Sequence, residues 1–242
     1  MRNIQVGTIN GDNNQFNQNN VNIKNINHNG GGNNRGGGNG KEDPGGEAAS
    51  ILFAIFFAVV VATFLYLKYY EPIFFWLKIG VVATGIVHAT SFIPQWRNPN
   101  SGLGAMGHTF AGMLLAAAQA YVIITALNAL PAEVLEIASR PMTAKGMLPQ
   151  AMEVWNRFNN LGHRLITENM MTALLLTPAI ALNMFYGIQH LLDTLADAEQ
   201  SDVCAVVANW LRVFKSRGAP VAAFFTLGAY LVATGVLSPQ PV

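Results

Sequence analysis

The chain has 242 residues, of which 51% are hydrophobic and 11% charged, and its mean hydropathy is +0.30. A soluble domain carries about 25% charged residues because its surface faces water, so this composition indicates a membrane protein. The formal net charge of +1 gives no basic field for a polyanion, and we expect no nucleic-acid partner. The single cysteine, Cys204, excludes an intramolecular disulfide and a zinc ribbon.

The first 47 residues are almost entirely polar, with 14 Asn and 11 Gly. A stretch of this composition buries too little apolar surface to offset its chain entropy. Residues 30–47 are the richest in glycine, and we interpret them as a linker. Residues 1–29 have a different pattern.

Residues 1–29 contain two related copies of one short segment, offset by 17 positions. In each copy two apolar residues alternate with polar ones, a spacing that places both on one face of a strand. Residues 11–14, Gly-Asp-Asn-Asn, supply a turn between the copies. Two equivalent strands with many Asn and no Pro suit a cross-β stack, in which Asn side chains form ladders along the fibre. The matched apolar pairs are Ile4 with Val21, Val6 with Ile23, and Ile9 with Ile26.

The first copy also resembles a known class of motif. Ile4-Gln5-Val6-Gly7, followed by Asn-rich sequence, is similar to the core of RHIM-type amyloid signalling motifs. In bacteria and fungi such motifs link an immune receptor to a membrane-active or cell-death effector. The resemblance therefore implies a homo-oligomer, or a partner that carries a similar motif. The second copy departs from the pattern at Asn22 and Lys24. The alternative is a disordered tail that acts only as a tether.

Five apolar segments follow the tail, and each is about as long as the 20 residues needed to cross about 30 Å of hydrocarbon. The fold class we predict is an all-α polytopic membrane domain over residues 48–242. The residues Tyr70-Glu71-Pro72 predict a tight hairpin, with the first two segments antiparallel. The predicted transmembrane helices are 48–69, 73–93, 105–130, 170–192 and 218–237.

Two connections are predicted to be amphipathic helices. Residues 148–168 lead into the fourth segment, where Pro178 predicts a kink. In 201–217 the apolar residues form one helical stripe with basic residues near its end, which is typical of a helix in the membrane interface. Packing of this helix against the rest of the protein is the alternative. The stripe comprises Val203, Val206, Val207, Trp210 and Phe214, and the basic residues are Arg212, Lys215 and Arg217.

The distribution of Lys and Arg does not favour either orientation, because six lie near the membrane on each side. No segment of the tail resembles an export signal, so we expect a cytoplasmic N-terminus. The expected location is a cell membrane, the bacterial inner membrane.

Three basic side chains define a possible intramembrane polar site. Lys78 is the only charge well inside a predicted segment, and it either reaches back to the interface or lines a pore. His88 and His108 can face one another and relay protons, or form hydrogen bonds that pack the helices. We interpret the other polar residues inside the segments as forming hydrogen bonds between helices. They are Gln119, Asn128, Asn183, Gln189 and His190.

No catalytic motif is present, and we expect neither an enzyme nor a cofactor. Asp193 and Asp197 lie one helical turn apart, as metal ligands can. With Glu199 and Asp202 they are interpreted as an acidic loop, and no metal site is expected.

The leading functional hypothesis is a membrane-perturbing effector of a bacterial defence or cell-death pathway, assembled through its tail. One rival is a structural subunit of an envelope assembly of the secretion or conjugation type. Another is a small channel or transporter that uses Lys78, His88 and His108.

Overall fold

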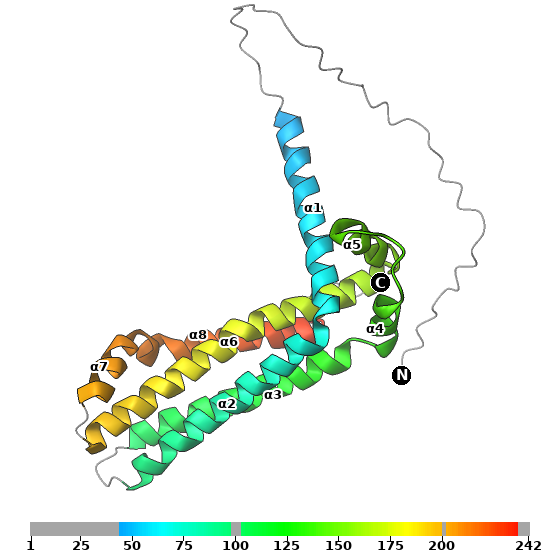
Figure 1. The fold of residues 1–242 in the computed structure, drawn as a ribbon. Coiled ribbons are helices and arrows are strands. Elements are labelled where there is room, and N and C mark those ends of the chain that lie inside the picture. The colour runs from blue at the N-terminus through cyan, green and yellow to red at the C-terminus, as the bar shows by residue number, and fades with distance from the viewer. Residues whose placement is uncertain (1–43, 98–102, 200–201, 237–242) are drawn as a thin grey trace, which may run out of the picture. The chain divides into compact units, whose positions relative to one another are not determined.

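The computed structural model describes residues 44–97, 103–199 and 202–236. The repeat, with Ile4, Gln5, Val6, Gly7, Ile9, Val21, Ile23 and Ile26, lies outside them, as does most of the linker. The described residues form helices and no strand (Figure 1). The helices are α1 (Pro44–Lys68), α2 (Tyr70–Arg97), α3 (Leu103–Ala129), α4 (Ala132–Ser139), α5 (Met147–Asn156), α6 (Asn160–Glu199), α7 (Asp202–Trp210) and α8 (Arg212–Ala233).

Four of these helices, α1, α2, α3 and α6, are long and apolar enough to cross a membrane. The prediction of an all-helical membrane protein is thereby confirmed. The fifth predicted segment differs, because the apolar part of α8 spans only Arg217–Ala233 and the helix ends before residue 237. Gly235, at φ 69°, ends it: its N–H bonds the carbonyl of Val232, and the N–H of Val236 bonds that of Leu231. This is a glycine-terminated Schellman cap.

Helices α2, α3, α6 and α8 run alongside one another as a bundle, with successive helices in opposite directions (Figure 1). Their contacts are close because small side chains line them, including Ala116, Ala179, Ala222 and Ala229, all nearly or fully buried. Large apolar side chains fill one half of the bundle. The other half contains buried polar side chains, among them His88, Gln95, Gln119, Asn183 and Gln189.

Helices α1 and α2 do not form the predicted hairpin, and that prediction is wrong. Helical hydrogen bonds continue through the junction, from Tyr69 N–H to the Leu65 carbonyl and from Ile73 N–H to the Tyr69 carbonyl, each 2.9 Å. Pro72 lies in the first turn of α2, where it lacks an N–H and its ring crowds the carbonyl of Lys68. The chain therefore bends instead of reversing, and α1 packs mainly on α5 (Figure 1).

An ion pair and the hydrogen bonds around it hold together the connection from α3 to α6. Arg157, directly after α5, and Glu153 on α5 lie 2.6 Å apart, and Arg157 also donates to the carbonyls of Ile137, Arg140 and Pro141. Glu153 accepts from the backbone N–H groups of residues 143 and 144. These N–H donors, together with the guanidinium, lower the pKa of Glu153 to about 2.

Both connecting helices differ from their predicted extents. The 148–168 connection divides into α5 and the first turns of α6. Helix α6 is 40 residues long in total and remains a helix through Pro178. The 201–217 connection breaks at Leu211, so α7 ends at Trp210. Arg212, Lys215 and Arg217 instead belong to the first turns of α8. Along α7, Val203, Val206, Val207 and Trp210 are exposed, whereas Phe214 in α8 stacks on Phe185.

Candidate functional site

A hydrogen-bonded group of buried polar side chains crosses the bundle near its centre. Nε2 of His88 donates to Oδ1 of Asn183 over 3.2 Å, and Nδ2 of Asn183 donates to the Gly112 carbonyl (3.2 Å) and to Oε1 of Gln119 (3.4 Å). Nε2 of Gln119 donates to the hydroxyl of Thr226, 3.3 Å away. One side chain from each of the four helices takes part, so the group couples α2, α3, α6 and α8.

The imidazole of His88 fits between two glycines on neighbouring helices. A Cβ added to Gly112 of α3 would lie 2.1 Å from Cε1 of His88, and one added to Gly187 of α6 would lie 3.0 Å from it. Because the ring is completely buried and flanked on both sides, neither neighbour tolerates a larger residue without displacing it.

Tyr186 lies between the two histidines that the sequence singled out. Its hydroxyl shares a 2.9 Å hydrogen bond with Nδ1 of His108, and its ring centroid is 6.0 Å from that of His88. His190 stands 5.2 Å from His108 and 5.3 Å from Tyr186, centroid to centroid. Three imidazoles and one phenol therefore form a continuous cluster.

Further polar contacts continue toward the C-terminal end of α6. Gln189 donates to Asp193 over 2.7 Å. Beside them Thr109 donates to Gln95, and Gln95 donates to Thr194. The polar groups thus form a column along one face of α6, which we call the polar column: Asn183, Tyr186, Gln189, His190 and Asp193 with their partners on α2, α3 and α8.

The polar column reaches from one end of the bundle to its interior. Asp193 and Asn183 are separated by about 15 Å along α6, at 1.5 Å per residue, or half of the hydrocarbon thickness. Gln119 and Thr226 lie close to the middle of the apolar stretches of α3 and α8. Polar groups so deep in a membrane need partners, and the four-helix hydrogen bonds provide them.

A second polar contact marks the opposite end of the bundle. Tyr66 donates to Oδ1 of Asn169, and Nδ2 of Asn169 donates 2.5 Å to the carbonyl of Ala126. This contact joins α1, α3 and α6. Between it and Asn183 the buried side chains of α6 are mostly apolar, with Ala173, Leu176, Ala179 and Ile180 among them.

The three residues proposed as an intramembrane site do not form one site. His88 and His108 both contact Tyr186, but Lys78 is exposed on α2, about 15 Å along the helix from His88. Of the residues expected to join helices, Gln119 and Asn183 do so, and Asn128 is exposed. Tyr186 was not among the residues singled out from the sequence. The imidazole of His88, which lies beside Gly112, explains why a glycine is needed at that position.

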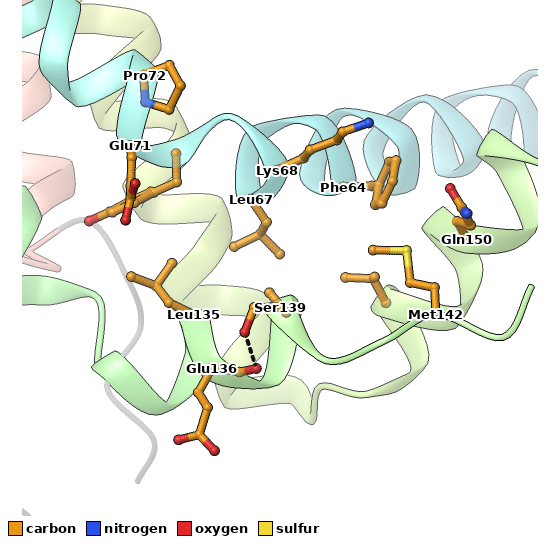
Figure 2. A pocket seen from close by; sticks show the side chains of 13 residues that line it. Phe64, Leu67, Lys68, Glu71, Pro72, Leu135, Glu136, Ser139, Met142 and Gln150 are labelled. Atoms are coloured by element: carbon orange, nitrogen blue, oxygen red, sulfur yellow. Dashed lines mark hydrogen bonds between the residues drawn. The ribbon is translucent and has the colours of Figure 1, made fainter.

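A cavity of about 690 Å³ lies away from the polar column, where the last turns of α1 and the start of α2 meet α4 and α5 (Figure 2). Phe64, Leu67, Leu135 and Met142 give it apolar walls, with Lys68 and Glu71 also at its lining. Figure 2 shows the side chain of Glu136 directed away from α1. The volume suits a small molecule or part of a lipid.

The geometry defines a class of protein. It is a multi-helix membrane protein whose bundle contains a polar column of histidine, tyrosine and amide side chains. Among the residues that the structure describes, no three His, Cys, Asp or Glu side chains are grouped to hold a metal ion. Neither a protein-family model, nor a curated protein, nor a solved structure matches the chain.

Proposed function

We propose that this chain is a bacterial inner-membrane effector that is assembled through its N-terminal tail and that then makes the bilayer permeable. The observation that carries the proposal is the repeat in residues 1–29, whose apolar positions match across an offset of 17 residues. A segment with two equivalent strands can template copies of itself, or a partner that has the same motif. The lipid bilayer and further copies of the chain are the partners.

Helix α1 supports this proposal, because it follows the linker directly and its apolar surface has few neighbours. It has the highest hydropathy of the four long helices, and only 17% of its most apolar window is buried. Exposed side chains include Phe53, at 65%, together with Ile51, Leu52 and Ile55. Clustering through the tail, on the cytoplasmic face in this proposal, brings many such surfaces together in one patch of bilayer. Helix α8 serves as an additional crossing, since it packs along α6.

Permeabilisation by the full chain in liposomes tests the proposal. Vesicles that contain a trapped dye and the purified protein should release dye after preformed fibres of the 1–29 peptide are added. Val6→Asp should abolish the release, because a charge in the strand repeats at every rung of a stack. Asn14→Asp, which adds the same charge in the turn, should leave the release unchanged. Equal release by all three proteins would overturn the role of the tail.

The exposed surface of α1 also fits a structural subunit, in which another protein covers it. In that case the tail is a tether, and a stable partner should remain bound during purification in mild detergent. A chain that purifies alone and releases dye only with an intact tail excludes this alternative.

A further inference from the structure

Of the buried polar side chains of α6, Asn183, Gln189 and His190 lie in one half of the bundle, whereas Asn169 and Thr172 lie toward its opposite end. From Asp193 inward the polar column ends at Asn183, Gln119 and Thr226. The next polar side-chain contact between helices on α6 is that of Asn169, 14 residues or about 21 Å away.

Apolar side chains close the remainder of the bundle. Leu176 is completely buried, and Ile180 and Ile123 are nearly so; all three belong to one continuous hydrophobic cluster with Val81 and Val122. We call Leu176, Ile180 and Ile123 the apolar barrier. An apolar constriction of this kind excludes water and therefore ions, which is how hydrophobic gates close pores.

His88 has an atom suited to accept a proton at the inner end of the column. Its Nε2 donates to Asn183, which leaves Nδ1 as the atom with the lone pair. This Nδ1 is fully buried and has no hydrogen-bond partner among the described residues. The side chains that surround the ring are those of Asn183 and Tyr186 on α6, next to the two glycines.

We propose that α2, α3, α6 and α8 enclose a proton half-channel, which leads from the Asp193 end to His88 and stops at the apolar barrier. A proton enters through His190, His108 and Tyr186 and binds to Nδ1 of His88. His190 and His108 each take a proton on one ring nitrogen and release one from the other, and the hydroxyl of Tyr186 gives up its own proton as it accepts the next. The proton that reaches His88 stays there, on an imidazolium at the closed end of the path, because the amide oxygen of Asn183 does not take it on. The inference concerns the membrane domain and does not rest on assembly through the tail.

The conducted species is the proton and not a metal cation. A cation that loses its water needs carboxylates or several carbonyl oxygens around it. The interior of the column offers amides, hydroxyls and imidazoles, and its carboxylate, Asp193, lies at the outer end. Imidazoles exchange protons near neutral pH.

Opening the barrier tests the proposal. The full chain, in a Val6→Asp background so that the tail contributes nothing, is placed in liposomes with a trapped pH dye and a potassium gradient set by valinomycin. Leu176→Asn extends the polar column into the barrier and should raise the proton flux about tenfold, equivalent to about 1.4 kcal/mol of barrier. Leu174→Asn is the matched control: Leu174 lies two residues away on α6, is 58% exposed, and should leave the flux unchanged.

Two further variants separate a proton path from a general leak. His88→Gln keeps a donor for Asn183 but cannot carry a proton, so adding it to Leu176→Asn should return the flux to the wild-type level. Potassium flux without valinomycin should stay at background in every variant. If Leu176→Asn fails to fold by gel filtration, Ile123→Ser on α3 replaces it, with Ile124→Ser, at an exposed position, as its control. Equal fluxes in the barrier variant and its control, or no effect of His88→Gln, would overturn the half-channel, and a matching rise in potassium flux would overturn the assignment to protons.

Discussion

The imidazole of His88 lies directly against the backbone of Gly112, so close that a methyl group on this glycine would come within 2.1 Å of Cε1. The ring cannot withdraw, because a Cβ on Gly187 would lie 3.0 Å from the same atom on the other side. The hydrogen bond to Asn183 holds it in place as well. One histidine thus sets the distance between three helices.

We therefore expect Gly112→Ala to destabilise the bundle by about 1–3 kcal/mol, the usual effect of overpacking a filled interior. Thermal unfolding in detergent, followed by circular dichroism, measures the change as a lower Tm. Gly107→Ala on the same helix is the control, since no heavy atom lies within 4 Å of its added Cβ. In a His88→Ala background, Gly112→Ala should lower the Tm less, because the ring that the new methyl group would overlap is absent. Equal Tm values for Gly112→Ala and Gly107→Ala would contradict this packing.

The bend between α1 and α2 can be distinguished from a hairpin by cross-linking. In a Cys204→Ser background, cysteines at Phe56 and Trp155 should be joined by a short thiol cross-linker, because these rings lie 5.9 Å apart across α1 and α5. Cysteines at Phe56 and Ile86 should not be joined. A hairpin that turns at Glu71 would place those two positions opposite one another, so cross-linking of the second pair would contradict the bend.

The Glu153–Arg157 pair predicts an acid-sensitive connection between α3 and α6. The pKa of Glu153 lies at about 2, below its ordinary 4.5, so its stabilising effect is complete above pH 4.5 and declines as the pH falls toward 2. Glu153→Gln should therefore lower the Tm at neutral pH, and the difference from wild type should disappear near pH 2. Glu136→Gln, on the exposed side of α4, should match the wild type throughout. A difference that persists at pH 2 would show that the carboxylate charge is not its source.

The repeat makes a separate prediction for the isolated tail. A peptide of residues 1–29 should form thioflavin-positive fibres with a cross-β spacing of about 4.8 Å between strands. Val6→Asp or Ile23→Asp should prevent them, because like charges would stack in a dry interface. Gln5→Ala should only slow their formation, since the backbone ladder and the apolar face remain. If the wild-type peptide stays monomeric for days at high concentration, the prediction is wrong and the tail acts only as a tether.

Composition and apolar run length were sufficient to predict a helical membrane protein, because the bilayer imposes a length and a polarity that can be counted along a chain. They also located α3 closely and identified the polar residues inside the segments. His88, Gln119 and Asn183 were recognised as groups that need partners for the same reason.

The tertiary structure alone decided which partners His88, Gln119 and Asn183 contact. Tyr186 connects His88 with His108, and Lys78 lies apart from both, because helix rotation and depth depend on packing between faces that are similarly apolar. The bend at Pro72 was missed for a related reason: a proline in the first turn of a helix is compatible with a reversal or a bend. The packing of α1 on α5 selects the bend over the reversal. Such contacts between distant segments cannot be read from a local sequence pattern.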